Sequence, residues 1–521
     1  MRRFNVTGAC VPEKVYMVDI AVKIAEISKL IDEGAYFTIN RARQFGKTTT
    51  LGQLWRTLNE KYLMIFLSLE GIGDTTMASE ETFCLTFMEL IQTNLSLQHG
   101  LDENYTQSWL DESVDSFYKL GRHLTKMTKG RKLVLMIDEV DKISHNRVFL
   151  NFLGLLRHKF LSQQLGMDST FHSVILTGVY DIKNIKLKLI NEGTHIPSES
   201  ENKLKNSPWN IATTFTVDMS FSPTEIQTML DDYEREYQLC MDTVLLSHEI
   251  FRFTNGYPFL VSNICKIIDE RLNKNWTLTG IQEAVKRTMK EDSVLHQDLT
   301  KNLSANQELS DLLYDVLILG RRRSFAIGDP NISLAVLYGY IQEGNEAVKL
   351  ANKIFEAWIS NYFIAQDERK NTHEIRNLTF QEVLKNGRFN MELFLVKFAE
   401  YFNDVFTTRD ETFLERQGRL FFLLCLKPFL NGQGFYYIES ENTDLGKMDV
   451  VVNYSNEEFI IELKRWDGEA KNKKAYTQLL NYMEHRKAST GYLLNFDFRQ
   501  RKQIRSQRLS FHDKAIFEVF V

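Results

Sequence analysis

The sequence predicts an α/β protein of several domains, and three observations support this. Apolar stretches of strand length alternate with segments of helical periodicity over the first 220 residues, a pattern typical of a parallel sheet covered by helices on both faces. The polar stretch 366–387 then interrupts the pattern, and strand-like segments return after residue 434. A chain of 521 residues is also too long to fold around one hydrophobic core, which suggests roughly two to four domains.

These patterns predict three domains. Residues 1–220 hold the alternating strands and helices, and 366–521 form a second α/β domain. Between them, 221–365 are mostly helical, and we expect a helical lid that runs into a winged-helix-like module. A basic triplet in this part, Arg321 to Arg323, could contact phosphates or complement the dipole at a helix end.

The composition excludes several classes of protein. With 43% hydrophobic and 25% charged residues the chain is ordinary for a globular protein, and its net charge of −5 means that any polyanion must bind at a local patch. The 5 cysteines are scattered without a C-x-x-C motif, which argues against disulfides and a zinc site. The longest apolar run, 420–426, is too short to span a bilayer, so we expect a soluble, cytoplasmic protein without a membrane partner.

A phosphate-binding pattern follows the first predicted strand. Residues 36–39 are apolar or β-branched, Gly46-Lys47-Thr48 comes six residues after Asn40, and helical periodicity runs over 49–62. In such a motif backbone N–H groups face the phosphates, the lysine reaches the terminal ones and the threonine hydroxyl serves Mg²⁺. Arg41 stands where the general motif has glycine, so a chance helix start is the alternative.

Further strands and helices are expected along the first domain. The predicted strands after the first are 63–69, 132–137, 173–177 and 213–218. The predicted helices are 22–31, 80–95 and 107–127. Five strands alternating with helices favour a parallel sheet.

The third strand runs directly into Asp138 and Glu139. Acids at the carboxyl end of a buried strand suit a nucleotide site, with Asp138 holding Mg²⁺ through water and Glu139 polarising the attacking water. The alternative is that the pair caps the next helix. Thr177 ends the fourth strand and could sense the terminal phosphate or cap a turn. The expected ATP-binding set is Arg43, Phe45, Gly46, Lys47, Thr48, Thr49 and Thr177.

The later parts of the chain carry their own predicted elements. Helices are expected at 224–237, from about 258, at 347–359, 391–402, 411–426 and 475–486. Strands are expected at 434–438, 448–453, 458–465, 491–496 and 515–521.

A second group of polar residues lies on two of these strands. A turn at Ser455-Asn456 places Asp449 on one strand and Glu462 with Lys464 on its neighbour, where alternation puts Glu462 and Lys464 on one face. Two carboxylates and a lysine provide the Mg²⁺ ligands and the ammonium that phosphodiester hydrolysis needs. An exposed hairpin with ordinary surface charges is the alternative.

Neighbouring residues extend this group. Glu415 precedes it on a helix, and Gln478 and Tyr482 share a face of a later helix at i and i+4. The basic residues nearby are Lys471, Lys473, Lys474, Arg499, Arg501, Lys502, Arg505 and Arg508, with Trp466 and Tyr476 among them. Such a run is either a polyanion footprint or a solvated surface.

Both groups resemble known families. The first is similar to AAA-ATPase-like proteins, whose phosphate loop reads Arg-x-Arg-Gln/Arg-Phe-Gly-Lys-Ser/Thr; the matching residues are Arg41, Arg43, Phe45, Gly46, Lys47 and Thr48, and 134–141 resembles the Walker B segment. The second resembles the PD-(D/E)XK nuclease superfamily through Gly446 to Asp449, Glu462-x-Lys464 and Gln478-x-x-x-Tyr482.

The resemblance implies a P-loop ATPase fused to a metal-dependent nuclease, with Asp449, Glu462, Lys464 and Gln478 at the nuclease site. ATP and Mg²⁺ are the expected cofactors, and nucleic acid, with DNA favoured over RNA, is the expected partner. A role in anti-phage defence or mobile elements is suggested for relatives. The alternative is a regulatory NTP sensor that binds nucleic acid or another partner without cleaving it. A homo-oligomer could supply Arg157 as an arginine finger, whereas Arg41 or Arg43 would serve in cis.

Overall fold

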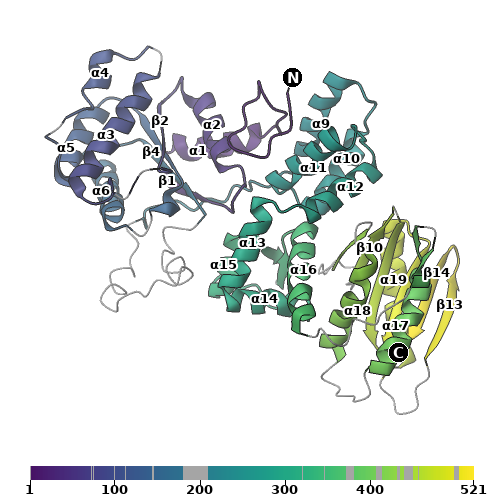
Figure 1. Ribbon diagram of the computed structural model, residues 1–521. Helices are drawn as coiled ribbons and strands as arrows, with labels where there is room; N and C mark the ends of the chain where they lie inside the picture. Colours follow the sequence, from purple (N-terminus) through teal and green to yellow (C-terminus); the bar gives the residue numbers. More distant parts are fainter. Residues whose placement is uncertain are drawn as a thin grey trace. The chain divides into compact units, whose positions relative to one another are not determined.

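The structure, a computed structural model, is drawn in Figure 1. It describes residues 2–521 except 72, 74, 99, 112, 144–145, 180–208, 320, 345–346, 371–380, 386, 406–413, 431–433, 439–449, 456, 467 and 498–503. The chain divides into two compact units. One comprises residues 1–237 and 257–262, and the other comprises residues 238–256 and 263–521.

The first unit is built on a parallel sheet. Its strands are β1 Tyr36–Asn40, β2 Leu63–Ser68, β3 Leu133–Asp138 and β4 Ser173–Gly178, in the order β1-β4-β3-β2. Its helices are α1 Ala21–Asp32, α2 Lys47–Leu58, α3 Glu80–Ser96, α4 Glu103–Gln107, α5 Phe117–Thr128, α6 Arg147–Gln164 and α9 Pro223–Tyr237, with the 3₁₀ turn η1 Val140–Lys142. The predicted parallel sheet is confirmed.

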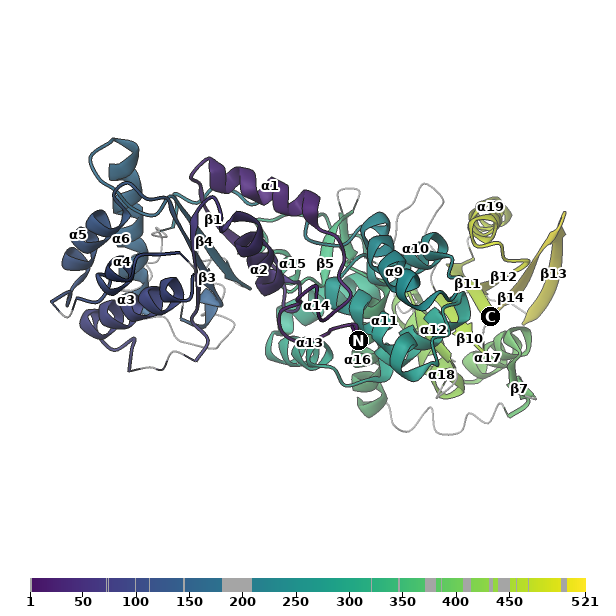
Figure 2. The same ribbon diagram turned by 90° about the horizontal axis from the view of Figure 1, so that it is seen from above.

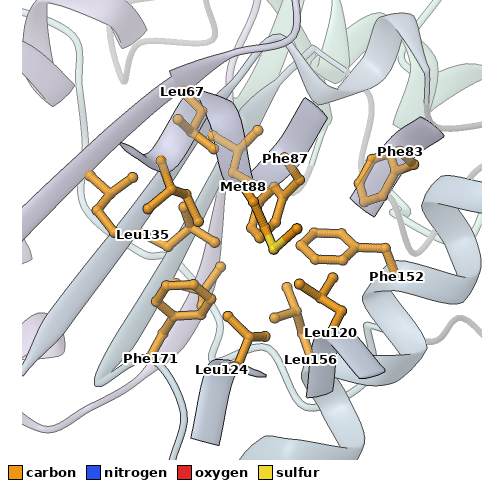
Figure 3. Packing of buried hydrophobic residues seen from close by; sticks show 14 of the residues in the cluster. Leu67, Phe83, Phe87, Met88, Leu120, Leu124, Leu135, Phe152, Leu156 and Phe171 are labelled. Atoms are coloured by element: carbon orange, nitrogen blue, oxygen red, sulfur yellow. The ribbon is translucent and has the colours of Figure 1, made fainter. Parts of the chain in front are cut away.

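Helices cover both faces of this sheet because most strand residues are apolar. On β3, Leu133 and Leu135 pack toward α3, α5 and α6, whereas Val134 and Met136 pack toward α1 and α2. The two groups of helices lie on opposite sides of the sheet in Figure 2. Figure 3 shows the larger core, where the ring of Phe152 lies beside Met88 and packs against the rings of Phe83 and Phe87. This alternation is what a parallel sheet buried on both faces requires.

The predicted fifth strand, 213–218, is wrong. Within it the structure contains only one parallel bridge, between Phe37 and Thr213, with the Thr213 N–H donating to the carbonyl of Tyr36. The carbonyl of Val217 instead accepts a hydrogen bond from the Arg41 guanidinium at 2.8 Å. A side chain therefore takes the place that a neighbouring strand would occupy.

The predicted helix 107–127 is also wrong in its first half. The chain forms α4 up to Gln107 and begins α5 only at Phe117. Between them the Asp111 side chain accepts hydrogen bonds from the backbone N–H and the hydroxyl of Ser113. Such a local turn competes with helical hydrogen bonding, which explains the break.

The second unit starts with a helical region. Its elements are α10 Thr243–Thr254, α12 Leu278–Lys290, α13 Val294–Ala305, α14 Gln307–Leu317, α15 Pro330–Leu337, β5 Ile341–Gly344, β6 Ala347–Leu350 and α16 Lys353–Lys370. Helix α11, Pro258–Arg271, contributes its first residues to the first unit and the rest to the second.

A hairpin in this region corrects the predicted helix 347–359. Residues Ala347–Leu350 form β6, which pairs antiparallel with β5, and α16 begins only at Lys353. The side chain of Asn352 accepts from the N–H of Phe355 at 2.9 Å, which is the geometry of a helix cap. Helices followed by a two-stranded hairpin are compatible with the predicted winged-helix-like module.

A six-stranded mixed sheet forms the rest of the second unit. Its strands are β9 Gly434–Tyr437, β10 Val450–Tyr454, β11 Glu457–Arg465, β12 Thr490–Phe496, β13 Arg505–Phe511 and β14 Lys514–Phe520, in the order β13-β14-β12-β11-β10-β9. Strands β11, β12 and β14 are mutually parallel and the other pairs are antiparallel. The preceding elements are η3 Gln381–Val383, β7 Leu384–Lys385, β8 Arg388–Phe389, α17 Met391–Val405 and α18 Leu414–Leu430.

Helices cover both faces of this sheet as well. Helix α19, Glu469–Arg486, lies on one side and α17 and α18 on the other (Figure 2). Across the sheet, Glu462 is in register with Leu493, and Leu493 with Glu518, so these side chains leave the sheet on one face. Asn472 of α19 donates to Glu518, which identifies this face as the one beneath α19. No helix among the described residues is long and apolar enough to cross a membrane.

Candidate functional site

The phosphate-binding motif forms a strand, a loop and a helix, in that order. β1 ends at Asn40 and α2 begins at Lys47, with Gly46 as its N-cap at φ 80°. That left-handed conformation is one that glycine adopts without strain. The backbone N–H groups of the first turn of α2 therefore have no carbonyl partner within the helix and are the natural donors to an anion.

Lys47 lies against the loop that precedes it. Its Nζ donates to the carbonyls of Arg41 at 2.9 Å and Ala42 at 3.0 Å. Burial lowers the pKa of Lys47, while the negative charges of Asp141 and Asp138 act in the opposite direction. The ammonium is thus held inside the loop, near the acidic residues Asp138 and Asp141.

Asp138 is the centre of the acidic side of this site. Its carboxylate accepts hydrogen bonds from the Thr48 hydroxyl at 2.6 Å, from the Thr177 hydroxyl and from the N–H of Glu139 at 2.9 Å. These residues come from α2, β4 and the end of β3. Because parallel strands end at one edge of their sheet, the fold brings together residues that are far apart in the sequence.

Glu139 has an unusual backbone conformation. It lies directly after β3 at φ 57°, ψ 37°, the left-handed region, and caps η1. A non-glycine residue there carries local strain of the kind that is concentrated at functional sites. The turn directs the chain out of the sheet immediately after Asp138.

The other predicted loop residues have different surroundings. The Arg41 guanidinium donates to the carbonyls of Asn40 and Val217 and lies 5.3 Å from the Phe215 ring, so it anchors the loop. Burial lowers the pKa of Arg41. Arg43 is exposed.

Two further predicted residues lie outside this arrangement. The hydroxyl of Thr49 accepts a hydrogen bond from the N–H of Cys10 at 3.1 Å, so it contacts the N-terminal segment. Arg157 is half-buried within α6.

Tyr257 belongs to this site but was not predicted from the sequence. Its hydroxyl donates to the carbonyl of Arg43 at 2.6 Å, and its ring packs edge-on against Phe45 at 4.8 Å. The residues before it, Asn255 and Gly256, both have positive φ and end α10. The Asn-Gly-Tyr-Pro sequence predicted the start of a helix, but the contact of Tyr257 with the phosphate loop is a tertiary feature.

The second predicted site lies on β11. Glu462 is 0% exposed and pairs with Lys464, with 2.5 Å between Oε1 and Nζ. The two side chains share a face, as alternation predicted, and it is the face beneath α19. A wholly buried carboxylate is costly unless a cation lies beside it, and Lys464 provides that charge.

Helix α19 contributes Gln478 and Tyr482. Gln478 is partly exposed, whereas Tyr482 is buried and its hydroxyl accepts from Arg486 Nε at 3.2 Å. Asp449 lies outside the described residues, as do Gly446, Lys447 and Met448; the side chain of Glu415 is not described either. Val450, the residue after Asp449, pairs with Ile461, the residue before Glu462.

The basic residues do not form a single group. Lys471, Lys473 and Lys474 are exposed along the first turns of α19. Arg505 and Arg508 instead lie on β13, a strand not predicted, where Arg508 pairs with Glu392 at 2.6 Å and Arg505 covers the Phe520 ring at 4.1 Å. Arg499, Arg501 and Lys502 lie outside the described residues.

The chemistry of both donor sets suits a hard divalent cation. Thr48 and Asp138 present oxygen atoms beside the phosphate loop, and Glu462 presents a carboxylate beside Lys464. In the part of the chain that the structure describes, no group of three or more histidine, cysteine or acidic side chains lies close enough to enclose a metal.

Comparison with known proteins identifies two families. Residues 11–361 match the model of the AAA-like domain, and residues 434–507 match that of the PD-(D/E)XK nuclease superfamily. None of the curated proteins compared with the chain matches it.

Several solved structures are similar in part. A Walker-type ATPase of Pyrococcus abyssi is 14% identical, covers 68% of this chain and 99% of its own, and has a TM-score of 0.46. The Aeropyrum pernix ORC2 protein matches in its ADPNP–ADP complexes at 10% identity, covering 67% of this chain and 93% of its own, with a TM-score of 0.32. Its ADP form matches at 11% identity, covering 66% of this chain and 93% of its own, with a TM-score of 0.33. Values this low do not transfer a function. The family match spans most of the chain, and the chain therefore belongs to the AAA-like domain family, with a PD-(D/E)XK nuclease superfamily domain after it.

Proposed function

We propose that this protein is an ATP-dependent switch coupled to Mg²⁺-dependent cleavage of phosphodiester bonds in nucleic acid. The observation that carries the cleavage activity is the Glu462–Lys464 pair, a wholly buried carboxylate beside an ammonium on the face beneath α19. Metal-assisted hydrolysis needs a carboxylate to hold the cation and a positive charge beside it, and this pair provides both.

In the first unit, ATP binds at the N-terminus of α2. Lys47 exchanges its bonds with the loop carbonyls for the terminal phosphates, and the N–H groups from Gly46 onward bind phosphate oxygens. Thr48 and Asp138 hold Mg²⁺, which neutralises charge on the phosphates. Glu139 orients the attacking water, and Thr177 senses the terminal phosphate from its place beside Asp138.

In the second unit, Asp449 and Glu462 provide the hard oxygen ligands of a divalent cation. Lys464 lies beside Glu462, where its ammonium orients a water and offsets negative charge that develops on the phosphate. Gln478 contacts the bound phosphate from α19. The exposed lysines 471, 473 and 474 attract the polyanion, with DNA favoured over RNA.

The test uses an isosteric pair of variants on one strand. Purified wild-type protein is incubated with labelled linear duplex DNA, single-stranded DNA and RNA, with and without Mg²⁺ and ATP. Glu462→Gln removes the charge of the site, and Glu457→Gln makes the same change at an exposed position of β11. We expect Mg²⁺-dependent cleavage that Glu462→Gln loses and Glu457→Gln keeps.

Two outcomes would overturn the cleavage activity. One is full cleavage by a folded Glu462→Gln variant. The other is the absence of cleavage in every condition while ATP is hydrolysed, which would favour a regulatory NTP sensor that binds nucleic acid without cutting it.

A further inference from the structure

A buried tyrosine in the second unit joins the helical region to the nuclease-superfamily sheet. Tyr437, on the edge strand β9, is 0% exposed, and its hydroxyl accepts hydrogen bonds from two arginines. Arg252 of α10 donates to it at 3.4 Å and Arg486 of α19 at 2.5 Å. The hydroxyl therefore lies between two guanidinium groups that come from opposite ends of the unit's sequence.

Both arginines also face the same carboxylate, that of Glu458. Arg252 Nη1 and Arg486 Nε each lie 3.6 Å from a Glu458 oxygen, and Arg252 forms a second pair with Glu249 at 2.5 Å. The side chains of Arg252 and Arg486 are only 21% and 13% exposed, so water screens these charges weakly. Charge-assisted hydrogen bonds in such surroundings depend strongly on distance and angle.

Arg486 connects this cluster to the predicted nuclease site. Its Nε donates to the hydroxyl of Tyr482, and Tyr482 stands one turn from Gln478 on the same helix face. A displacement of α10 would lengthen or shorten the hydrogen bond from Arg252 to Tyr437 and its ion pair with Glu458. The hydrogen bond of Arg486 to Tyr437 and its pairing with Glu458 would then change in length or angle. Because Arg486 also binds the hydroxyl of Tyr482, the position of Tyr482 would change as well.

Helix α10 also leads directly to the phosphate loop along the chain. Tyr257 follows Arg252 by five residues, and within the first unit it holds the carbonyl of Arg43 and packs on Phe45. The residues between them include Asn255 and Gly256, both at positive φ, a conformation that Gly256 adopts without strain. A short segment thus contacts the loop of one unit at its end and the Tyr437 cluster of the other at its beginning.

We infer that Arg252, Tyr437 and Arg486 are positioning residues that make the Gln478–Tyr482 face of α19 respond to the nucleotide bound at the phosphate loop. This inference rests on the proposed function for its biological meaning, because it specifies how the ATP site regulates the cleavage site. The coupling itself is a property of the chain and can be measured without cleavage.

The test is hydrogen exchange of the backbone amides of α19. Exchange is followed with no nucleotide, with ADP and with a non-hydrolysable ATP analogue, in the wild type, in Tyr437→Phe and in Tyr492→Phe. Tyr437→Phe removes one hydroxyl and keeps the ring. Tyr492→Phe is the matched control, since Tyr492 is a buried tyrosine of the same sheet and is in register with Ile461 on the opposite face from Glu462.

We expect the analogue to change exchange in the second half of α19 by about fivefold or more in the wild type and in Tyr492→Phe, the lower end of typical allosteric couplings. Tyr437→Phe should lose this change while it still binds the nucleotide. Arg252→Gln provides a second variant that leaves Tyr437 in place, should Tyr437→Phe prove unstable. It should lose the change as well.

The failures of the two proposals are distinguishable. The coupling would be overturned, even if the protein cleaves DNA, by either of two results. One is that nucleotide does not change hydrogen exchange in α19 of the wild type, and the other is that the change persists in both Tyr437→Phe and Arg252→Gln. A nucleotide-dependent change that the variants lose, in a protein that cleaves nothing, would keep the coupling and reject the nuclease activity.

Discussion

The hydroxyl of Thr48 donates to Asp138 Oδ2 across 2.6 Å and so joins the first turn of α2 to the end of β3. The two residues would share one Mg²⁺ in the ATP complex, Asp138 through a water molecule. Removing an outer-sphere partner of a metal typically lowers its affinity by about tenfold to a hundredfold.

Asp138→Asn should raise the Mg²⁺ concentration needed for half-maximal ATP hydrolysis by about tenfold to a hundredfold. A titration of ATPase rate against Mg²⁺ measures this. Thr48→Ser keeps the hydroxyl and should behave as the wild type. An unchanged Mg²⁺ requirement in Asp138→Asn would remove this residue from the metal site.

Tyr257→Phe should weaken nucleotide binding by roughly threefold to tenfold, the range expected for loss of one hydrogen bond that shapes the loop. Titration with a fluorescent ATP analogue gives the affinity. Tyr105→Phe is the matched control, since its hydroxyl also donates to a backbone carbonyl, that of Met127, at 3.1 Å. Equal weakening in both variants would indicate general destabilisation instead.

The stability of the first unit should decline in mild acid because of His123. This side chain is buried in α5 with its ring edge-on to Trp109, and burial lowers the pKa of His123 despite the opposing charge of Asp111. Well above a pH of about 6.5 the imidazole is neutral in both the folded and the unfolded state, so its titration does not reduce stability there. As the pH falls below 6.5, the unfolded chain binds a proton that the folded chain resists, and stability falls.

The slope from His123 should not exceed about 1.4 kcal/mol per pH unit and should end once the folded state is also protonated. Thermal melts between about pH 5 and about pH 8, on both sides of the ordinary imidazole pKa of about 6.5, compare the wild type with His123→Gln. The variant should show a flatter dependence. Parallel curves would mean that other groups cause the acid sensitivity.

Glu518→Leu should destabilise the second unit strongly. The carboxylate of Glu518 is fully buried and accepts hydrogen bonds from Asn472, Tyr476, Asn495 and Gln507. Leucine would leave these donors without an acceptor, at a cost of about 1 to 3 kcal/mol for each donor that cannot reach water. Asp513→Leu, at a position 83% exposed, is the control, and melting temperatures report the difference.

Much of the architecture follows from the sequence because its strands are short, apolar and well separated. The four strands of the first sheet, and β11, β12 and β14 of the second, lie within a few residues of their predicted positions. The link between Thr48 and Asp138 was also predictable, since parallel strands end at one edge.

The errors arise where local pattern and tertiary context disagree. Thr213 to Asp218 has the composition of a strand, but Arg41 binds the carbonyl of Val217. Arg505 to Phe511 forms an exposed edge strand and is therefore mostly polar. Its arginines suggested a polyanion footprint or a solvated surface, and no apolar alternation indicated a strand. The Tyr257 contact depends on a turn that brings distant residues together, and no periodicity encodes it.

The position of β14 determines when the second sheet can be completed during synthesis. This strand comes after every other strand of its sheet in the sequence, yet it lies between β12 and β13 and is hydrogen-bonded to both. Ribosomes add about 5–20 residues per second, so the four strands of the first sheet are complete on the order of half a minute before β14 emerges. The parallel sheet of the first unit can therefore form on the nascent chain before the six-stranded sheet of the second unit is complete.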